Sequence, residues 1–285
     1  MIIDVHAHTS NHKMLGLHTE NAKIEDLERM ANKYGVQKII LLATYFPFKK
    51  SGLKNKELLE RIRGKDLFLS FGSLDAMNHL KEGIRELEDL LSERLIQGIK
   101  LYPGYQNFDP SDESLFPIYS LAKKYAVPVM FHTGELHHCC SRKERIEKRY
   151  RCKAKECWID LLGHLSEPQK IEFAVWKFPD VKFLLSHLGN PYFNQLRQLM
   201  KRYDNIYTDI SGQFLSGTEE DTPEYRQTLK EEISKFLDLP FGLGRVLFGT
   251  DFPIQSYKDS IQLIEDLGLS DMKRNWSFTK MQKVS

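Results

Sequence analysis

Eight short apolar runs alternate with amphipathic segments along almost the whole of this 285-residue chain. The runs are nearly continuous in Val, Ile, Leu and Phe, which is typical of parallel strands that are buried on both faces. Eight such units predict a (β/α)8 TIM barrel that forms a single domain over residues 1–285. A doubly wound open sheet is the alternative architecture. The expected strands are Ile2–Val5, Val36–Ala43, Leu67–Phe71, Ile96–Leu101, Val127–Phe131, Val181–Leu185, Asn205–Asp209 and Arg245–Phe248.

The segments between these runs show the period of a helix. Apolar residues recur at helical spacing from Ile24 to Ala31 and from Leu80 to Leu91. Ser166, Glu167 and Pro168 form a helix-start signal, in which a capping hydroxyl is followed by an early proline. Further helices are predicted over Lys54–Ile62, Ser114–Tyr125, Gln169–Lys177, Pro191–Tyr203, Pro223–Leu237 and Tyr257–Leu267.

Four of the expected strands end in side chains that can bind a metal ion. His6 and His8 are separated by one residue at the end of the first strand, so both imidazoles face the same side. His132 directly follows the fifth run, and His187 and Asp251 come two and three residues after the sixth and eighth runs. In an open sheet the ends of these strands lie too far apart to share an ion, whereas in a closed barrel they converge on one mouth. This convergence favours the barrel.

Three imidazoles and one carboxylate form a donor set that suits Zn²⁺, with Mn²⁺, Fe²⁺ and Co²⁺ as alternatives. We therefore predict that His6, His8, His132 and Asp251 bind one divalent ion at the barrel mouth. Such an ion lowers the pKa of its water to about 7, and Asp251 could accept the proton of that water with its second oxygen. Each histidine taken alone could instead be a buried residue that only makes hydrogen bonds.

His187 and Lys100 admit more than one role. His187 could be a further ligand, a hydrogen-bond bridge across the barrel mouth, or a catalytic acid or base beside the metal, which is the role we favour. Lys100 lies inside an apolar strand, where a lysine is costly unless it is paired. It could bind a substrate carboxylate, or be carboxylated and bridge two metal ions. It could also pair with Asp4, which by the period of two shares the face of His6 and His8.

These residues lie in stretches that resemble the amidohydrolase superfamily, specifically its branch of mononuclear metal-dependent hydrolases and decarboxylases. The resemblance implies that His6, His8, His132 and Asp251 bind the metal and that His187 is the catalytic histidine beside it. Residues 275–280 and the cysteine-rich segment depart from the family pattern. The matching stretches are Ile3–His8, Gly98–Pro103, Phe108–Asp112, Val127–Gly134, Ser186–Gly189 and Val246–Pro253.

A long connection after the fifth expected strand, at about residues 134–165, interrupts the regular alternation. Residues 141–156 contain eight basic and three acidic side chains, although the net charge of the whole chain is only +2. We predict a basic insertion above the barrel mouth, which could recruit an anionic substrate. All four cysteines fall within 19 residues of this insertion: Cys139, Cys140, Cys152 and Cys157.

These cysteines, together with His137 or His138, could hold a second, structural zinc ion. Their spacing matches no standard zinc finger. A redox-sensitive lid and four unliganded thiols are the alternatives.

The composition restricts the classes of partner. A net charge of +2 does not favour nucleic acid. No apolar stretch approaches the roughly 18 residues that span a bilayer, so no membrane partner is expected. The first strand begins at once, which leaves no room for a signal peptide and predicts a cytoplasmic protein. The sequence leaves a homo-oligomer open.

These observations predict a metal-dependent hydrolase in which metal-activated water attacks an amide, ester or lactone of a small anionic substrate. Asp251 would pass the proton to the leaving group, while the metal and His187 stabilise the developing oxyanion. The alternative is a non-oxidative decarboxylase of an aromatic or unsaturated carboxylic acid, which would use the same ligands. A binding module whose basic insertion docks an anionic partner is a hypothesis from a different class.

Overall fold

The computed structural model describes residues 2–10, 22–45, 53–138, 140, 144, 146–149, 155–218 and 221–268. Its strands form one eight-stranded sheet, in which each strand pairs in parallel with the next one along the chain. The strands are β1 (Ile2–Ala7), β2 (Val36–Leu42), β3 (Phe68–Gly72), β4 (Gly98–Leu101), β5 (Val129–Phe131), β6 (Phe183–Leu185), β7 (Ile206–Asp209) and β8 (Val246–Leu247).

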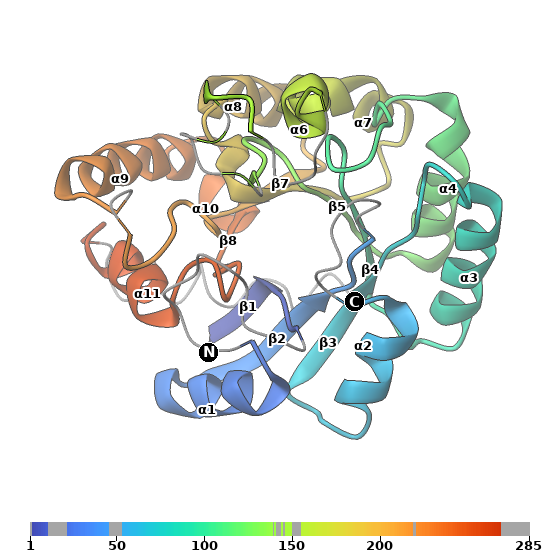
Figure 1. Ribbon diagram of the computed structural model, residues 1–285, viewed down its shortest axis with the longest axis horizontal. Helices are drawn as coiled ribbons and strands as arrows, with labels where there is room; N and C mark the ends of the chain where they lie inside the picture. The colour runs from blue at the N-terminus through green and yellow to red at the C-terminus, as the bar shows by residue number, and fades with distance from the viewer. Residues whose placement is uncertain are drawn as a thin grey trace.

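Contacts between β1 and the chain around β8 bring the two edges of the sheet together. The Val5 N–H donates to the Phe248 carbonyl oxygen (3.0 Å) and the His8 N–H to that of Phe252 (2.8 Å). Ala7 and Phe252 form a parallel bridge. Figure 1 shows the helices arranged as a ring outside the strands. The predicted (β/α)8 TIM barrel is confirmed, and each of the eight expected strands overlaps an observed strand.

The helices arise from the amphipathic segments. Leu27 and Ala31 are buried one turn apart in α1, as are Leu87 and Leu91 in α3, because positions i and i+4 share a helix face. None of the helices formed by the described residues is long and apolar enough to cross a membrane. The α-helices are α1 (Ile24–Tyr34), α2 (Asn55–Ile62), α3 (Leu80–Ser92), α4 (Phe116–Tyr125), α6 (Trp158–Leu162), α7 (Glu172–Lys177), α8 (Phe193–Arg202), α9 (Pro223–Leu237), α10 (Gly242–Arg245) and α11 (Tyr257–Glu265).

The connection after β5 differs in detail from the expectation. It contains the short helix α6, followed by two 3-10 turns, η2 (Gly163–Ser166) and η3 (Pro168–Ile171). The predicted capping role of Ser166 is wrong, because Glu167 occupies the N-cap position of η3. The buried Ser166 hydroxyl is directed instead at the carbonyl oxygens of Gly134 and Gly163, each at 2.6 Å. The divergent residues 275–280 lie outside the described residues, as do Cys139 and Cys152.

The largest hydrophobic cluster lies between the strands and the outer helices. Phe131 of β5 and Phe183 of β6 pack against Tyr119 of α4, with ring centroids 6.1 Å and 5.6 Å from that of Tyr119. All three rings are fully buried. A smaller cluster, which includes Val5 and Met130, fills the inside of the barrel. The sheet of the barrel is therefore closely packed on both faces, which makes the strand ends rigid.

We expect Phe183→Ala to lower the free energy of unfolding by about 3–5 kcal/mol, because it leaves a cavity among well-packed aromatic rings. Denaturant unfolding followed by circular dichroism measures this loss. Phe173→Ala is the matched control, since the Phe173 side chain is 44% exposed. Equal losses for the two variants would contradict the packing described here.

Candidate functional site

Side chains from the first and last strands meet at the carboxyl-terminal end of the barrel. His6 of β1 and Asp251, which follows β8, are buried, whereas His8 is partly exposed. The Nε2 atoms of His6 and His8 lie 3.5 Å and 3.2 Å from the same oxygen, Oδ1 of Asp251. The ligand atoms of the three residues lie within 4.8 Å of one another. These three residues could therefore hold one metal ion.

Hydrogen bonds between β1 and the chain after β8 set this geometry. The Asp251 N–H donates to the carbonyl oxygen of His6 (2.7 Å). Thr250 donates to the Asp4 carboxylate from its N–H (3.1 Å) and from its Oγ1 (2.7 Å). The His6 N–H donates to Asp4 as well (3.0 Å). Burial raises the pKa of Asp4 to about 7, although the hydrogen bonds from Thr250 oppose the rise.

The prediction that Asp4 shares the face of the β1 histidines is wrong. The pairing of β1 with β2 shifts register between Asp4 and Ala7. Such an irregularity breaks the alternation of side chains along a strand. As a result Asp4 interacts with Thr250 and with Tyr257 of α11, and it stabilises the β1–β8 seam instead of lining the site.

The end of β7 supplies a carboxylate that the sequence analysis did not use. Oδ2 of Asp209 lies 3.1 Å from Nδ1 of His6, and Oδ1 accepts the backbone N–H of His187 (3.0 Å) and the hydroxyl of Ser211. Burial alone would raise the pKa of Asp209, but the interactions with His6 and His187 outweigh burial and lower it. Asp209 ends an expected strand, as the predicted ligands do, and this position was the signal that could have identified it.

His132 and His187 lie side by side, with Nδ1 of His132 3.2 Å from Nε2 of His187. The opposite nitrogens face carbonyl oxygens: His187 Nδ1 is 3.0 Å from Ser211 O, and His132 Nε2 is 3.2 Å from Glu135 O. A carbonyl oxygen can only accept, so we assign the ring protons to these outer nitrogens. The inner nitrogens of the two rings then face each other with unshared lone pairs. The structure thus places His132 against His187 and not within the group formed by His6, His8 and Asp251.

The same reasoning assigns the His6 proton to Nδ1, which faces the Asp209 carboxylate. Its Nε2 therefore presents a lone pair to the Asp251 carboxylate, at 3.5 Å. Lone pairs and a carboxylate that face one another in a buried site repel unless a cation lies between them. Nitrogen and oxygen ligands of tetrahedral zinc, at about 2.0–2.1 Å from the ion, stand about 3.3–3.4 Å apart. The donor set therefore fits a divalent cation.

The electrostatics keep these groups in the protonation states that metal binding requires. Burial, followed by the nearby positive charge of Lys100, lowers the pKa of His6 to about 3. Burial also lowers the pKa values of His132 and His187. Burial alone would raise the pKa of Asp251, but the neighbouring histidines outweigh it and hold that pKa well below its usual range. Near neutral pH the buried imidazoles are neutral and the carboxylate is ionised.

The backbone at the site adopts conformations that most residues avoid. Asp251 has φ 55° and His187 has φ 64°, both in the left-handed region. Gly212 allows the two side chains to approach each other. A Cβ atom there would lie 2.6 Å from Oδ2 of Asp251 and 2.9 Å from Nδ1 of His187.

Lys100 of β4 is fully buried. Its Nζ donates to Oγ of Ser186 (3.0 Å) and lies 5.3 Å from the ring centroid of Tyr102. Burial lowers the pKa of Lys100 to about 7, although the charges of Asp209 and Asp251 oppose the shift. Among the described contacts Lys100 does not pair with Asp4, which was one of its possible roles. Asp4 instead accepts a hydrogen bond from Thr250.

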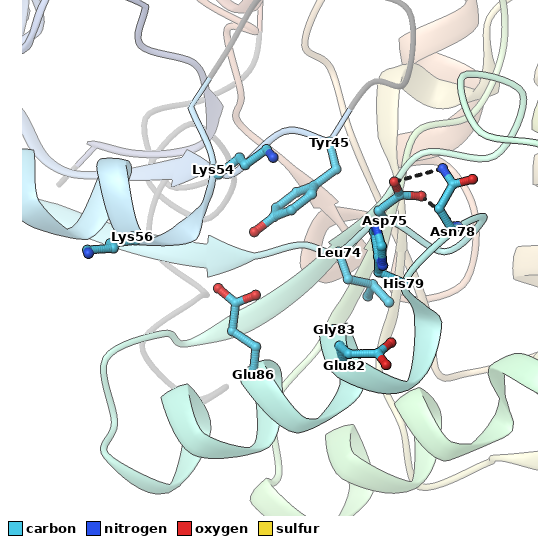
Figure 2. Close-up of a pocket in the computed structure, with 10 residues that line it drawn as sticks. All are labelled: Tyr45, Lys54, Lys56, Leu74, Asp75, Asn78, His79, Glu82, Gly83 and Glu86. Carbon is cyan, nitrogen blue, oxygen red and sulfur yellow. Dashed lines mark hydrogen bonds between the residues drawn. The ribbon is translucent and has the colours of Figure 1, made fainter.

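The described residues also form a pocket of about 570 Å³ away from this cluster (Figure 2). It lies where Tyr45 follows β2 and Asp75 follows β3, beside α2 and α3. Lys54 and Glu86 are among its charged lining residues, so it carries both signs of charge. None of the predicted metal ligands lines it.

We expect Asp209→Asn to weaken divalent-metal binding about 10- to 100-fold, because the amide no longer fixes the His6 tautomer. Competition with a chromophoric chelator measures the affinity. Asp204→Asn is the matched control, because Asp204 is exposed at the other end of β7. Unchanged affinity in Asp209→Asn would show that the orientation of His6 does not depend on this carboxylate.

Known structures resemble the chain over nearly its whole length. An uncharacterized TIM-barrel protein from Bordetella bronchiseptica is 17% identical, with a TM-score of 0.72 over 99% of this chain and 97% of that chain. A dihydroxybenzoic acid decarboxylase from Polaromonas sp. JS666, solved with manganese and the inhibitor 2-nitroresorcinol, is 15% identical, with a TM-score of 0.68 over 99% and 96%. A probable 2-pyrone-4,6-dicarboxylic acid hydrolase from Acinetobacter baumannii, solved with citric acid, is 13% identical, with a TM-score of 0.66 over 99% and 97%. At such identities the likeness shows a shared fold.

No curated protein sequence matches the chain. The family described as Amidohydrolase, in contrast, matches residues 3–275, which is nearly the entire chain. This match confirms the resemblance inferred from the sequence motifs. The chain belongs to the amidohydrolase family.

Proposed function

We propose that the protein is a metal-dependent hydrolase in which water attacks an amide, ester or lactone carbon of a small anionic substrate. The observation that carries this proposal is the convergence of the His6 and His8 imidazoles and the ionised Asp251 carboxylate on one end of the barrel. The carboxyl-terminal end of the strands is where TIM-barrel enzymes place their reacting groups. Membership of the amidohydrolase family supports the same reaction class.

In this proposal His6, His8, His132 and Asp251 hold one divalent ion, and zinc suits their nitrogen and oxygen donors best. When bound, such an ion activates water and polarises a carbonyl oxygen. His132 would bind through Nδ1, because its Nε2–H is directed at the Glu135 carbonyl oxygen. Manganese is the alternative, since the Polaromonas decarboxylase was solved with that metal.

Asp251 and His187 would move protons. The low pKa of Asp251 keeps its carboxylate ionised near neutral pH. In this proposal the carboxylate takes the proton of the attacking water and returns it to the leaving group. The contact of His187 Nδ1 with the Ser211 carbonyl oxygen leaves Nε2 unprotonated. His187 can therefore accept a proton at Nε2 and, once charged, stabilise a developing oxyanion.

Lys100 would favour an anionic substrate. Its charge reaches the site, because it contributes to the lowered pKa of His6. Its complete burial means that it acts at a distance and through Ser186, which directly precedes His187. The Acinetobacter hydrolase was solved with citric acid, which is an anion at neutral pH.

Decarboxylation of an aromatic or unsaturated carboxylic acid is the second candidate. The observation that favours it is the fold shared with the Polaromonas dihydroxybenzoic acid decarboxylase. His187 Nε2, after it has taken up a proton, could deliver that proton to the carbon that loses CO₂. The same donor set serves both reactions, so the products must distinguish them.

We expect Asp251→Asn to lower turnover about 100- to 10,000-fold, because it removes both a metal ligand and the proton acceptor. The assay offers lactones of dicarboxylic acids and hydroxybenzoates to the zinc-loaded and the manganese-loaded protein. Chromatography follows ring opening, and trapped CO₂ reports decarboxylation. Asp204→Asn is the control and should retain full activity.

Ring opening without CO₂ release would support the hydrolase. Release of CO₂ would contradict the hydrolase and support the decarboxylase. Full activity in Asp251→Asn, or in protein stripped of metal by a chelator, would refute the mechanism common to both.

A further inference from the structure

We propose that His138, Cys157 and Asp160 form a second, structural site for a zinc ion, separate from the barrel mouth. The proposal goes beyond the proposed function, because it concerns the connection after β5. Its side chains bring together the three donor types that bind zinc in proteins: an imidazole, a thiolate and a carboxylate.

The three residues come from two segments that the fold places together. His138 lies seven residues after β5, whereas Cys157 and Asp160 belong to the start of α6. Their ligand atoms lie within 4.8 Å of one another, and His138 Nε2 is 2.6 Å from Oδ1 of Asp160. Tetrahedral zinc holds nitrogen, oxygen and sulfur ligands about 3.3–3.8 Å apart. Small side-chain rotations would bring all three atoms to that spacing.

The surroundings of the three residues suit a structural ion. Cys157 is buried, the His138 side chain is 14% exposed and the Asp160 side chain is 50% exposed. The ion would thus have apolar protein on the cysteine side and an open path to solvent on the aspartate side. A water molecule could complete the tetrahedron from that open side. A hydrogen bond between His138 and Asp160 explains their approach without a metal, but it does not explain a thiol in the same group.

This site differs from the four-cysteine site that the sequence suggested. Cys157 is common to both sets. Cys140 is also buried, but it is not in the group formed by the described residues. Cys139 and Cys152 lie outside the described residues and are not needed for the site.

An ion here would also position a residue at the barrel mouth. The backbone N–H of His137, next to His138, donates to the hydroxyl of Tyr105 (2.7 Å). Cys157 packs in a hydrophobic cluster with the same tyrosine. The Tyr105 ring lies edge-on to His132, with centroids 4.9 Å apart. By joining His138 to α6, the ion would hold Tyr105 against a predicted ligand of the catalytic metal.

The experiment measures metal content and cobalt absorption on the full-length protein. Zinc is removed with a chelator and replaced by Co²⁺, whose bond to a thiolate gives a charge-transfer band in the near ultraviolet. The variant His6→Asn weakens the barrel-mouth site, which contains no cysteine, and should keep this band. Cys157→Ser should lose the band and one equivalent of metal, whereas the matched control Cys140→Ser should keep both.

A thiolate band that is absent from the wild type, or lost in Cys140→Ser as in Cys157→Ser, would overturn the proposal. Failure of the proposed function would look different, because His6→Asn would then change neither the metal content nor the catalytic rate.

Alkylation of the wild-type protein tests the site without any substitution. Iodoacetamide should modify Cys157 at least about 10-fold more slowly with zinc bound than after chelation, because the metal-bound thiolate is held by the ion. Peptide mass spectrometry reports the rate at each cysteine. Equal rates at Cys157 in the two states would refute the site.

Discussion

The hydrogen-bonded seam between Asp4 and Thr250 is the constraint on which the candidate active site depends. It joins the first strand to the chain after the last strand, and the two residues lie 246 positions apart in the sequence. His6 lies two residues after Asp4, and Asp251 directly follows Thr250. A fully buried carboxyl group is costly unless it is hydrogen-bonded, and the Thr250 and His6 donors offset that cost. The hydrogen bonds that close the barrel therefore also position His6 and Asp251 in the candidate site.

The charge distribution of the candidate site differs from that of an ordinary polar core. Two buried carboxylates, Asp209 and Asp251, face neutral imidazoles, and the buried Lys100 adds positive potential near them. The Asp209 carboxylate accepts hydrogen bonds from Nδ1–H of His6 and from the backbone N–H of His187. Asp251 instead faces a lone pair of His6. A buried lone pair that faces a carboxylate is unfavourable unless a cation lies between them. This arrangement fits the divalent ion that we propose for these residues.

The backbone at the candidate site is strained. Left-handed φ values at His187 and Asp251 cost free energy, about 1–3 kcal/mol for each strained residue. The hydrophobic cluster that contains Phe131 and Phe183 packs against the strands and holds the strained residues in place. Both strained residues follow strands, at the end of the barrel where their side chains converge. A glycine at position 212 leaves the space that they need.

The sequence by itself determined the eight strands, most of the helices between them and the strand ends near which the predicted ligands lie, because hydrophobic periodicity and strand-end positions are local properties. It also located His6, His8 and Asp251 as neighbours, since a closed barrel brings its strand ends together. Only the tertiary structure decided the rest. Because of the register shift in β1, Asp4 interacts with Thr250. Lys100 donates a hydrogen bond to Ser186, which lies 86 residues away in the sequence. Other features also depend on residues far apart in the chain. They are the ring protonation of His132 and His187, the contact of Asp209 with His6, and the approach of His138 to α6. Such contacts follow from packing in three dimensions, which no local pattern of residues encodes.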